Sequence, residues 1–268
     1  MNRSTAPAPD LRDALIEAFT RERVGMFREH HLVRVTHEPI SKLSLEEAYA
    51  VQGRFVAARV AAGECVVGWK IGCTSPNIQQ QFALTQPIAA RLTAPFVHSD
   101  GVALPAERYV DCGVEAEMVL RIGSDLSPEM DGIELRGAIA SVHPGIEVHN
   151  YRFWYGDPTS QELISSNGIH AGVVIGTEHS PTSFDFDAER MQLIVNDEVR
   201  SAGIASDIMG GPLVSLRWLV QHAAEQGESV RAGELVIPGS AVHLVRVSRG
   251  DRVEACFSRL GSCRAILV

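Results

Sequence analysis

Near residue 65 the hydrophobic pattern changes from helical spacing to short apolar runs bounded by glycine, and this change divides the chain into two parts. Before it, Asp10 can cap a helix that runs to about Arg23. Ser44-Leu45-Glu46-Glu47 matches the capping box, in which a hydroxyl and a glutamate satisfy free amides at the start of a helix. Apolar residues at helical spacing follow until Gly63, a residue type that commonly ends helices. Residues 1–64 are therefore predicted to be a helical N-terminal part.

After residue 65 the sequence favours strands, because apolar and β-branched residues cluster in short runs. The expected strands are residues 65–72, 114–122, 172–175, 191–195, 234–237, 241–247 and 252–257. Two helices are expected between them, a short one over 133–142 and a clearer one over 212–226. Because strands and helices do not alternate regularly, we expect an α+β fold. Residues 65–268 would form a β-rich catalytic core within one structural domain.

Charge and apolar content exclude several classes of protein. The net charge of −9 and the lack of a basic block argue against nucleic-acid binding. No run reaches the roughly 18 apolar residues of a membrane span, and the polar start does not resemble a signal peptide. The five cysteines show no CxxC pairing, so we expect reduced, mostly buried thiols and a cytoplasmic location.

Two glutamates alternate with apolar residues in Val114-Glu115-Ala116-Glu117-Met118-Val119-Leu120. On a strand Glu115 and Glu117 share one face. Carboxylates this close repel one another unless water or a cation separates their charges, and hard cations favour such oxygen ligands. The pattern alone leaves two readings open, a metal site and an edge strand with a solvated acidic face.

Glu147 is a second candidate, because it lies between two apolar residues after a predicted Pro144-Gly145 turn. An unpaired acid is costly in such a place. His143 and His149 flank this segment. Isolated histidines are more often surface or supporting groups than metal ligands, so ligation by either is the minor interpretation.

Lys70 lies in an apolar, strand-like run. A lysine there can be a desolvated proton carrier or an electrostatic clamp, or an ordinary lysine whose stem lies along an edge strand. Thr74 and Ser75 follow in a predicted turn and offer hydroxyls. The chain contains no GxGxxG motif after a strand, and no GxxxxGK[ST], GxSxG or HExxH motif.

The order of these segments resembles the 2-hydroxypentadienoate (2-keto-4-pentenoate) hydratase / 4-oxalocrotonate decarboxylase family of the fumarylacetoacetate hydrolase superfamily. The resemblance covers roughly residue 45 to the end. The matching segments are Gly68-Trp69-Lys70-Ile71-Gly72-Cys73-Thr74-Ser75, Val114-Glu115-Ala116-Glu117, Pro144-Gly145-Ile146-Glu147-Val148, Ser165-Ser166-Asn167, Ala171-Gly172-Val173-Val174-Ile175-Gly176, Gly211-Pro212-Leu213, Pro238-Gly239-Ser240 and Leu260-Gly261-Ser262.

The resemblance implies a mixed β-roll with flanking helices, and a Mg²⁺ or Mn²⁺ ion held by Glu115, Glu117 and Glu147. The substrates would be 2-oxo acids or their enols, whose developing charge the cation stabilises. Lys70 matches the family's active-site lysine. The hydroxyls of Thr74 and Ser75, together with Asn167 and Ser240, are the expected substrate-binding positions.

Four positions depart from the hydratase pattern. Where hydratases carry an acidic Glu-Pro-Asp-like motif, this chain has Gln86-Pro87-Ile88, and Asn150 and Ser166 stand where the family has aspartates. Ile88 and the apolar Trp69 before the lysine resemble the decarboxylase variant.

We therefore expect a lyase of aromatic catabolism that hydrates 2-hydroxypenta-2,4-dienoate to 4-hydroxy-2-oxopentanoate. A 4-oxalocrotonate decarboxylase is the alternative, followed by an acylpyruvate-type C–C hydrolase and by a non-catalytic subunit that binds metal or an oxo acid. By resemblance we also expect a homo-oligomer, with a complex between this chain and a related hydratase or decarboxylase as a further possibility.

Overall fold

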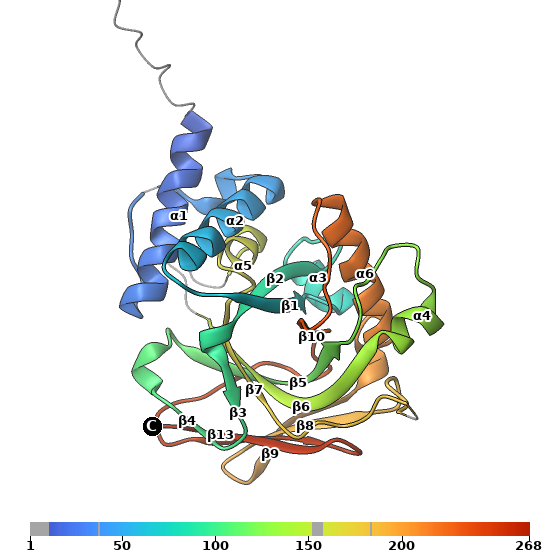
Figure 1. The fold of residues 1–268 in the computed structure, drawn as a ribbon. Coiled ribbons are helices and arrows are strands. Elements are labelled where there is room, and N and C mark those ends of the chain that lie inside the picture. Colours follow the sequence, from blue (N-terminus) through green and yellow to red (C-terminus); the bar gives the residue numbers. More distant parts are fainter. Residues whose placement is uncertain (1–10, 37, 152–157, 183) are drawn as a thin grey trace, which may run out of the picture.

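The computed structural model describes residues 11–36, 38–151, 158–182 and 184–268. Figure 1 shows two curved sheets in the lower part of the molecule, with α1, α2 and α5 grouped on one side and α4 and α6 on the other. This mixed helix and sheet architecture confirms the α+β expectation and the roll-like fold.

The larger sheet has the strand order β2-β1-β10-β5-β6-β7-β3, with β11 pairing to β5. It mixes parallel pairs, such as β1 with β10, and antiparallel pairs, such as β5 with β6. Its strands are β1 (Val66–Gly72), β2 (Ile88–Thr93), β3 (Val97–Ser99), β5 (Cys112–Ile122), β6 (Ile139–Asn150), β7 (His170–Ile175), β10 (Leu235–Ile237) and β11 (Val245–Arg246).

The smaller sheet packs on the outer face of the larger one, with β12 and β13 against β5 and β6. Its order is β4-β13-β12-β8-β9. Its strands are β4 (Val102–Leu104), β8 (Arg190–Val195), β9 (Glu198–Ile204), β12 (Arg252–Phe257) and β13 (Gly261–Leu267). The main hydrophobic core lies between the sheets, where Ala116 and Met118 of β5 join Val253 and Ala255 of β12.

The inner face of the larger sheet holds a second apolar cluster, which includes Leu92, Val119, Val173 and Leu235. Because side chains alternate along a strand, the face of β5 opposite its core residues carries Val119 together with Glu115 and Glu117. The curved sheet thus encloses apolar residues beside the two acids.

The helices begin where the sequence provides caps. Ser44 accepts from the Glu47 amide and Glu47 accepts from the Ser44 amide, which confirms the capping box. The helices are α1 (Leu11–Glu29), α2 (Leu45–Ala61), α3 (Pro76–Gln81), α4 (Gly132–Gly137), α5 (Ser160–Ser165) and α6 (Pro212–Glu225), with 3₁₀ turns η1 (Ile40–Lys42), η2 (Ala94–Phe96), η3 (Ala106–Arg108) and η4 (Ala205–Asp207).

Several predicted boundaries are wrong. The first helix extends to Glu29, the helix expected over 133–142 ends at Gly137, and the strand expected over 241–247 shrinks to β11. Pro144 and Gly145 form no turn but lie inside β6, where a Cβ on Gly145 would meet Val119 Cγ2 at 2.7 Å. Tertiary pairing with β5 extends this segment, so local turn propensity is overridden.

The helical layer combines distant parts of the chain. Phe19 of α1 packs with Ile40, Leu43 and Val51, and α2 also contacts α5 from the second half. The division at residues 64 and 65 stays a prediction, because the helical layer draws on both parts.

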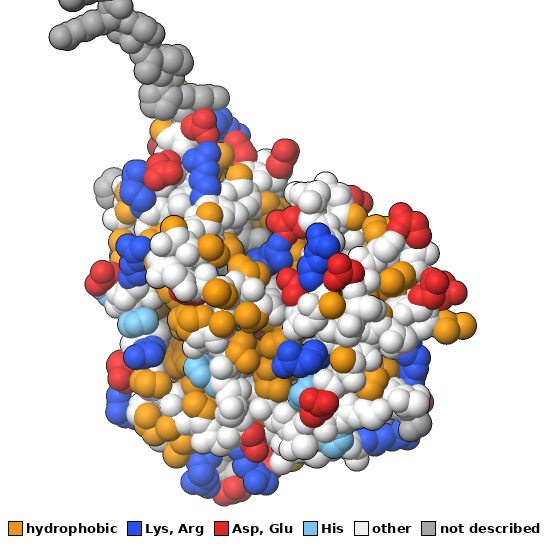
Figure 2. Space-filling view, in the orientation of Figure 1, with side chains coloured by type: hydrophobic (Ala, Val, Ile, Leu, Met, Phe, Trp, Pro, Cys, Tyr) orange, Lys and Arg blue, Asp and Glu red, His pale blue; other side chains and the backbone are white. Residues whose placement is uncertain are grey.

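The surface of the described part mixes both charge signs. Figure 2 shows charged side chains spread around one face and hydrophobic side chains concentrated near its centre. No helix among the described residues is long and apolar enough to cross a bilayer. All five cysteines are free, and Cys112 and Cys263 are buried whereas Cys65 is exposed. The expectation of mostly buried thiols therefore holds only in part.

Candidate metal and active site

The site begins with the register of two central strands. In the β5–β6 pair Glu115 lies directly opposite Glu147, and Glu117 lies opposite Gly145. Glu117 and Glu147 are 1% and 0% exposed, and β5 lies between β6 and β10. The alternative of an edge strand with a solvated acidic face is therefore wrong. Like charges directly opposite one another destabilise a sheet, so this arrangement needs compensating positive charge.

Lys70 supplies part of that charge. Its Nζ lies 3.2 Å from Glu147 Oε1, and the side chain is buried. Burial opposes the charged form, but the charges of Glu147, Glu115 and Glu117 outweigh it and raise the pKa of Lys70. Because β1 lies between β2 and β10, the alternative of a lysine extending from an edge strand is wrong.

His170 of β7 holds the same carboxylate from the other side. Its Nδ1 lies 2.7 Å from Glu147 Oε1. Burial lowers the pKa of His170. Burial disfavours the charged form of Glu147 too, but Lys70, His149 and His170 outweigh that effect and lower its pKa. Glu147 is thus held as an anion with Oε1 anchored by two partners. The sequence reasoning missed His170, for which the chain offers no local signal.

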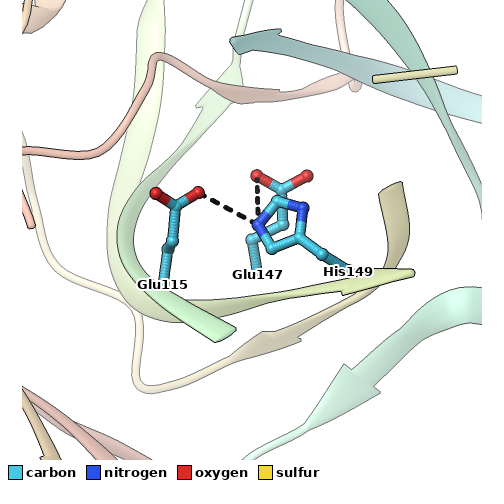
Figure 3. Close-up of side chains that lie close together, drawn as sticks. All are labelled: Glu115, Glu147 and His149. Carbon is cyan, nitrogen blue, oxygen red and sulfur yellow. Dashed lines mark ion pairs between the residues drawn. The ribbon is translucent and has the colours of Figure 1, made fainter. Parts of the chain in front are cut away.

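His149 also faces the acids, two residues after Glu147 on β6. Figure 3 shows Glu115, Glu147 and His149 converging, with dashed lines from the imidazole to both carboxylates. His149 Nε2 lies 3.0 Å from Glu115 Oε2 and 3.7 Å from Glu147 Oε2. Among the described residues, these three side chains each offer a ligand atom within 4.8 Å of the others. The sequence analysis gave ligation by His149 as the minor interpretation; the signal that could have favoured it is the period of two along a strand, which puts residues 147 and 149 on one face.

Glu117 is the third predicted ligand and lies deeper. Burial raises its pKa well above the ordinary value, and the charges of Glu147 and Glu115 add to that effect. The backbone amide of Gly239 donates to it, whereas Oε2 has no hydrogen-bond partner among the described residues. Such an orphaned buried oxygen is what a ligand position looks like before its cation is added.

The predicted substrate-binding residues differ in what they contact. The Ser240 hydroxyl donates to the Ala116 carbonyl at 2.9 Å, between the two glutamates of β5. Thr74 is buried beside Gly239. Ser75 caps α3 by accepting from the Ile78 amide. Ser240 is therefore bound to the strand between the acids, Thr74 packs on Gly239, whose amide donates to Glu117, and Ser75 has a local structural role.

Asn167 braces the backbone. Its Oδ1 accepts from the Arg91 amide and its Nδ2 donates to the Arg91 carbonyl, both at 2.8 Å. Asn167, Gly168 and Ile169 have positive φ angles of 59°, 64° and 55°. The amide thus ties a strained turn to β2, next to Lys70. Its role in substrate binding stays a prediction.

The positions that depart from the hydratase pattern also have defined surroundings. A Cβ on Gly72 would lie 3.3 Å from both Ile88 Cγ1 and Lys70 Nζ, so Ile88 and the lysine amine both lie next to Gly72. The Asn150 side chain accepts from the Val110 amide, and the Ser166 hydroxyl donates to the Glu162 carbonyl. None of these three side chains offers a carboxylate to handle a proton.

Trp69 points away from the acids, because neighbouring residues on a strand face opposite sides. It borders a groove of about 810 Å³ that α2 and the segment after α6 also line. The Arg91 guanidinium stacks 3.1 Å from the centre of the Trp69 ring, and Trp69 Nε1 donates to Glu234. Trp69 therefore lies on the face of β1 that lines the groove, opposite the face that carries Lys70.

His143 is separate from the acids. Its ring nitrogens lie 2.9 Å from Ser141 Oγ and 3.2 Å from the Gly176 carbonyl. Both nitrogens are engaged, so the structure favours the interpretation of His143 as a supporting group.

Comparison with known proteins identifies the family of this chain. The fumarylacetoacetate (FAA) hydrolase C-terminal family matches residues 79–268. The chain is 33% identical over 220 residues to a 2-keto-4-pentenoate hydratase of Paraburkholderia phymatum, covering 81% of this chain and 84% of that protein. It is 29% identical over 226 residues to a 2-hydroxyhexa-2,4-dienoate hydratase of Comamonas testosteroni, covering 83% and 86%.

Solved structures share the fold. The 4-oxalocrotonate decarboxylase of Pseudomonas putida G7, complexed with magnesium and adipate, superposes with a TM-score of 0.88 at 24% identity and covers all of both chains (100% each). A fumarylpyruvate hydrolase of Pseudomonas aeruginosa, with Mn²⁺ and pyruvate, has a TM-score of 0.59 at 15% identity and covers 75% of this chain and 89% of that one.

Proposed function

The chain belongs to the fumarylacetoacetate hydrolase C-terminal family, and from this premise we propose that it is a metal-dependent lyase acting on 2-hydroxy-dienoic or 2-oxo acids. The reaction we propose is hydration of 2-hydroxypenta-2,4-dienoate to 4-hydroxy-2-oxopentanoate, a step of aromatic catabolism. Relatives of about 30% identity over most of the chain that are named as hydratases support this reaction.

The observation that carries the proposal is the cluster of three acids, of which Glu117 and Glu147 are buried and Glu115 is partly exposed. Glu115 faces Glu147 directly across two central strands, and Glu117 keeps an orphaned oxygen beside them. Glu115, Glu147 and His149 each offer a ligand atom within 4.8 Å of the others, and Glu117 Oε2 has no hydrogen-bond partner among the described residues, so the residues present fit a divalent cation. Mg²⁺ or Mn²⁺ suits such oxygen donors. When bound, the cation would supply Lewis-acid stabilisation of the negative charge that develops on a 2-oxo acid.

Lys70 has a role defined by its charge. Because its pKa is raised, the ammonium persists at neutral pH and can hold an anionic substrate group or donate a proton. His170 and Lys70 hold the Glu147 carboxylate in place. Because Glu147 is a proposed metal ligand, this would fix the position of the cation, and of a substrate bound to it, relative to the Lys70 ammonium. Ser240 and Thr74 are proposed to bind substrate, as are Ser75 and Asn167.

Decarboxylation of a 4-oxalocrotonate-like diacid is the second candidate, and Ile88 favours it. An apolar side chain lies next to Gly72, which also adjoins the Lys70 amine, at the position where hydratases of the family carry an acidic residue. Decarboxylation needs no water activated at that position, so the loss of a carboxylate there matters less. An acylpyruvate-type hydrolase and a non-catalytic binding subunit remain as third and fourth candidates.

Three further features are proposed with the function. We expect a homo-oligomer, a cytoplasmic location, and a small-molecule substrate as the principal binding partner. Light scattering coupled to size-exclusion chromatography tests the oligomeric state. A monomer would contradict that expectation and leave the proposed reaction untouched.

The deciding experiment is mass analysis of products after separate incubations with 2-hydroxypenta-2,4-dienoate and 4-oxalocrotonate in Mg²⁺. Gain of water by the first substrate is the expected result. Loss of CO₂ from the second, with the first unchanged, would replace the hydratase by the decarboxylase. If neither substrate changed, the proposed lyase would be refuted in favour of the hydrolase or the binding subunit.

A further inference from the structure

We propose that His149 is a metal ligand of this chain, so that the cation is held by a mixed imidazole and carboxylate set in place of carboxylates alone. The inference rests on the proposed metal site and defines its ligands further. It predicts that the site binds a first-row transition ion such as Ni²⁺ more tightly than Mg²⁺, because imidazole suits Ni²⁺, whereas carboxylate and water suit Mg²⁺ and Mn²⁺.

The first support is that His149 is buried without hydrogen bonds. The residue is 1% exposed, and neither Nδ1 nor Nε2 has a hydrogen-bond partner among the described residues. Buried polar atoms are nearly always paired, and an exception requires a specific cause such as an absent ion. The carboxylates of Glu115 and Glu147 lie close to Nε2, but neither contact has the geometry of a hydrogen bond. A cation between Nε2 and the carboxylates accounts for this arrangement.

The second support is the separation of the candidate ligand atoms. A cation with ligands at about 2.1 Å places adjacent ligand atoms about 3 Å apart in octahedral geometry. Nε2 of His149 lies 3.0 Å from Glu115 Oε2 and 3.7 Å from Glu147 Oε2. All the candidate ligand atoms of this group lie within 4.8 Å of one another. These separations match ligands that share one ion.

The third support is how Glu147 divides its two oxygens. Oε1 receives His170 Nδ1 at 2.7 Å and Lys70 Nζ at 3.2 Å. The other oxygen, Oε2, is the one that faces His149. Lys70 Nζ also donates to Oε2 at 3.5 Å, so His170 holds Oε1, Lys70 contacts both oxygens, and Oε2 faces the proposed ion. Partners of this kind orient ligands and typically change metal affinity by about 10–100-fold when removed.

The test uses the full-length protein loaded with Mn²⁺ and electron spin echo envelope modulation spectroscopy. Nitrogen coupling from a coordinated imidazole is expected in the unsubstituted protein and should disappear in His149→Gln. His143→Gln is the matched control, because His143 lies on the same strand with both nitrogens engaged elsewhere. The control should keep the coupling. If His149→Gln fails to fold, His149→Asn takes its place.

A second readout is competition between metals. Equilibrium dialysis against Mg²⁺ and Ni²⁺, followed by elemental analysis, should show Ni²⁺ retained in preference. His149→Gln should lower Ni²⁺ affinity by about tenfold or more and reduce the preference over Mg²⁺. Unchanged preference in His149→Gln would overturn the inference.

The outcomes separate this inference from the proposed function. Tight Mn²⁺ binding without nitrogen coupling would refute His149 as a ligand and leave the carboxylate site intact. Failure to bind Mg²⁺, Mn²⁺ or Ni²⁺ at millimolar concentration would refute both. Coupling that persists in His149→Gln would assign the imidazole to another residue and overturn the inference.

Discussion

Replacing Gly168 by alanine should destabilise the fold and displace Lys70 in the same step. Gly168 has a φ of +64°, and a Cβ there would lie 2.6 Å from Lys70 Cε and 3.1 Å from Ala90 Cβ. The left-handed backbone costs an alanine about 1–2 kcal/mol, and overpacking a buried position costs about 1–3 kcal/mol. Gly168→Ala should therefore lower the free energy of unfolding by about 2–5 kcal/mol.

Two matched variants separate the two causes. Gly227 has a φ of +72° with nothing within 4 Å of an added Cβ, so Gly227→Ala isolates the backbone term. Gly53 lies inside α2, again with nothing within 4 Å, and Gly53→Ala should stabilise by about 0.5–1 kcal/mol. The expected order of stability is Gly53→Ala, then the unsubstituted protein, then Gly227→Ala, then Gly168→Ala.

Urea denaturation of the four proteins measures this order, and steady-state kinetics measures turnover in each. Because the added methyl group moves the Lys70 stem, Gly168→Ala should also lose turnover when fully folded, whereas Gly227→Ala should not. Equal stability of Gly168→Ala and Gly227→Ala would refute the packing argument. Normal turnover in a folded Gly168→Ala protein would show that the position of Lys70 does not limit the reaction.

Four further predictions follow from the same geometry. Lys70→Ala should lower kcat/KM by about 100-fold or more, whereas Lys42→Ala, at an exposed ion pair, should leave it unchanged; equal activity would refute the role of Lys70. Excess EDTA should abolish turnover and added Mg²⁺ or Mn²⁺ should restore it, and full activity in EDTA would refute the metal site. Ile88→Asp should increase the hydration rate by about tenfold by placing a carboxylate near Lys70, as product ratios will show; no change would remove Ile88 as a determinant of reaction type. Ser44→Ala should lower the free energy of unfolding by about 1 kcal/mol through loss of the capping box, and an unchanged urea midpoint would contradict that.

The local alternation of residue types was enough to predict the orientation of some of the site residues. The alternation around residue 116 assigned Glu115 and Glu117 to one face, and the structure confirms that β5 buries the other face in the core. The same rule applies to Glu147 and His149 on β6. The Ser44 capping box was equally local, since a first helical turn involves only four consecutive residues.

Other features depended on long-range pairing. No local signal marked the pairing of β5 with β6, which places Glu115 opposite Glu147, or the extension of β6 through Pro144 and Gly145. Slipping this register by one residue would turn every side chain to the other face, so the pairing is decided by the whole sheet and its two packed faces.

The sequence alone therefore indicated three glutamates on strand-forming segments as the candidate metal ligands and one lysine as the candidate catalytic group, with ligation by a histidine as the minor interpretation. Only the tertiary structure decided that His170 holds one oxygen of Glu147, that His149 faces the other, and that Lys70 lies against both. The physical reason is that side-chain direction along a strand follows a local period of two. Which strands become neighbours instead depends on burial and hydrogen bonding summed over segments far apart in the chain.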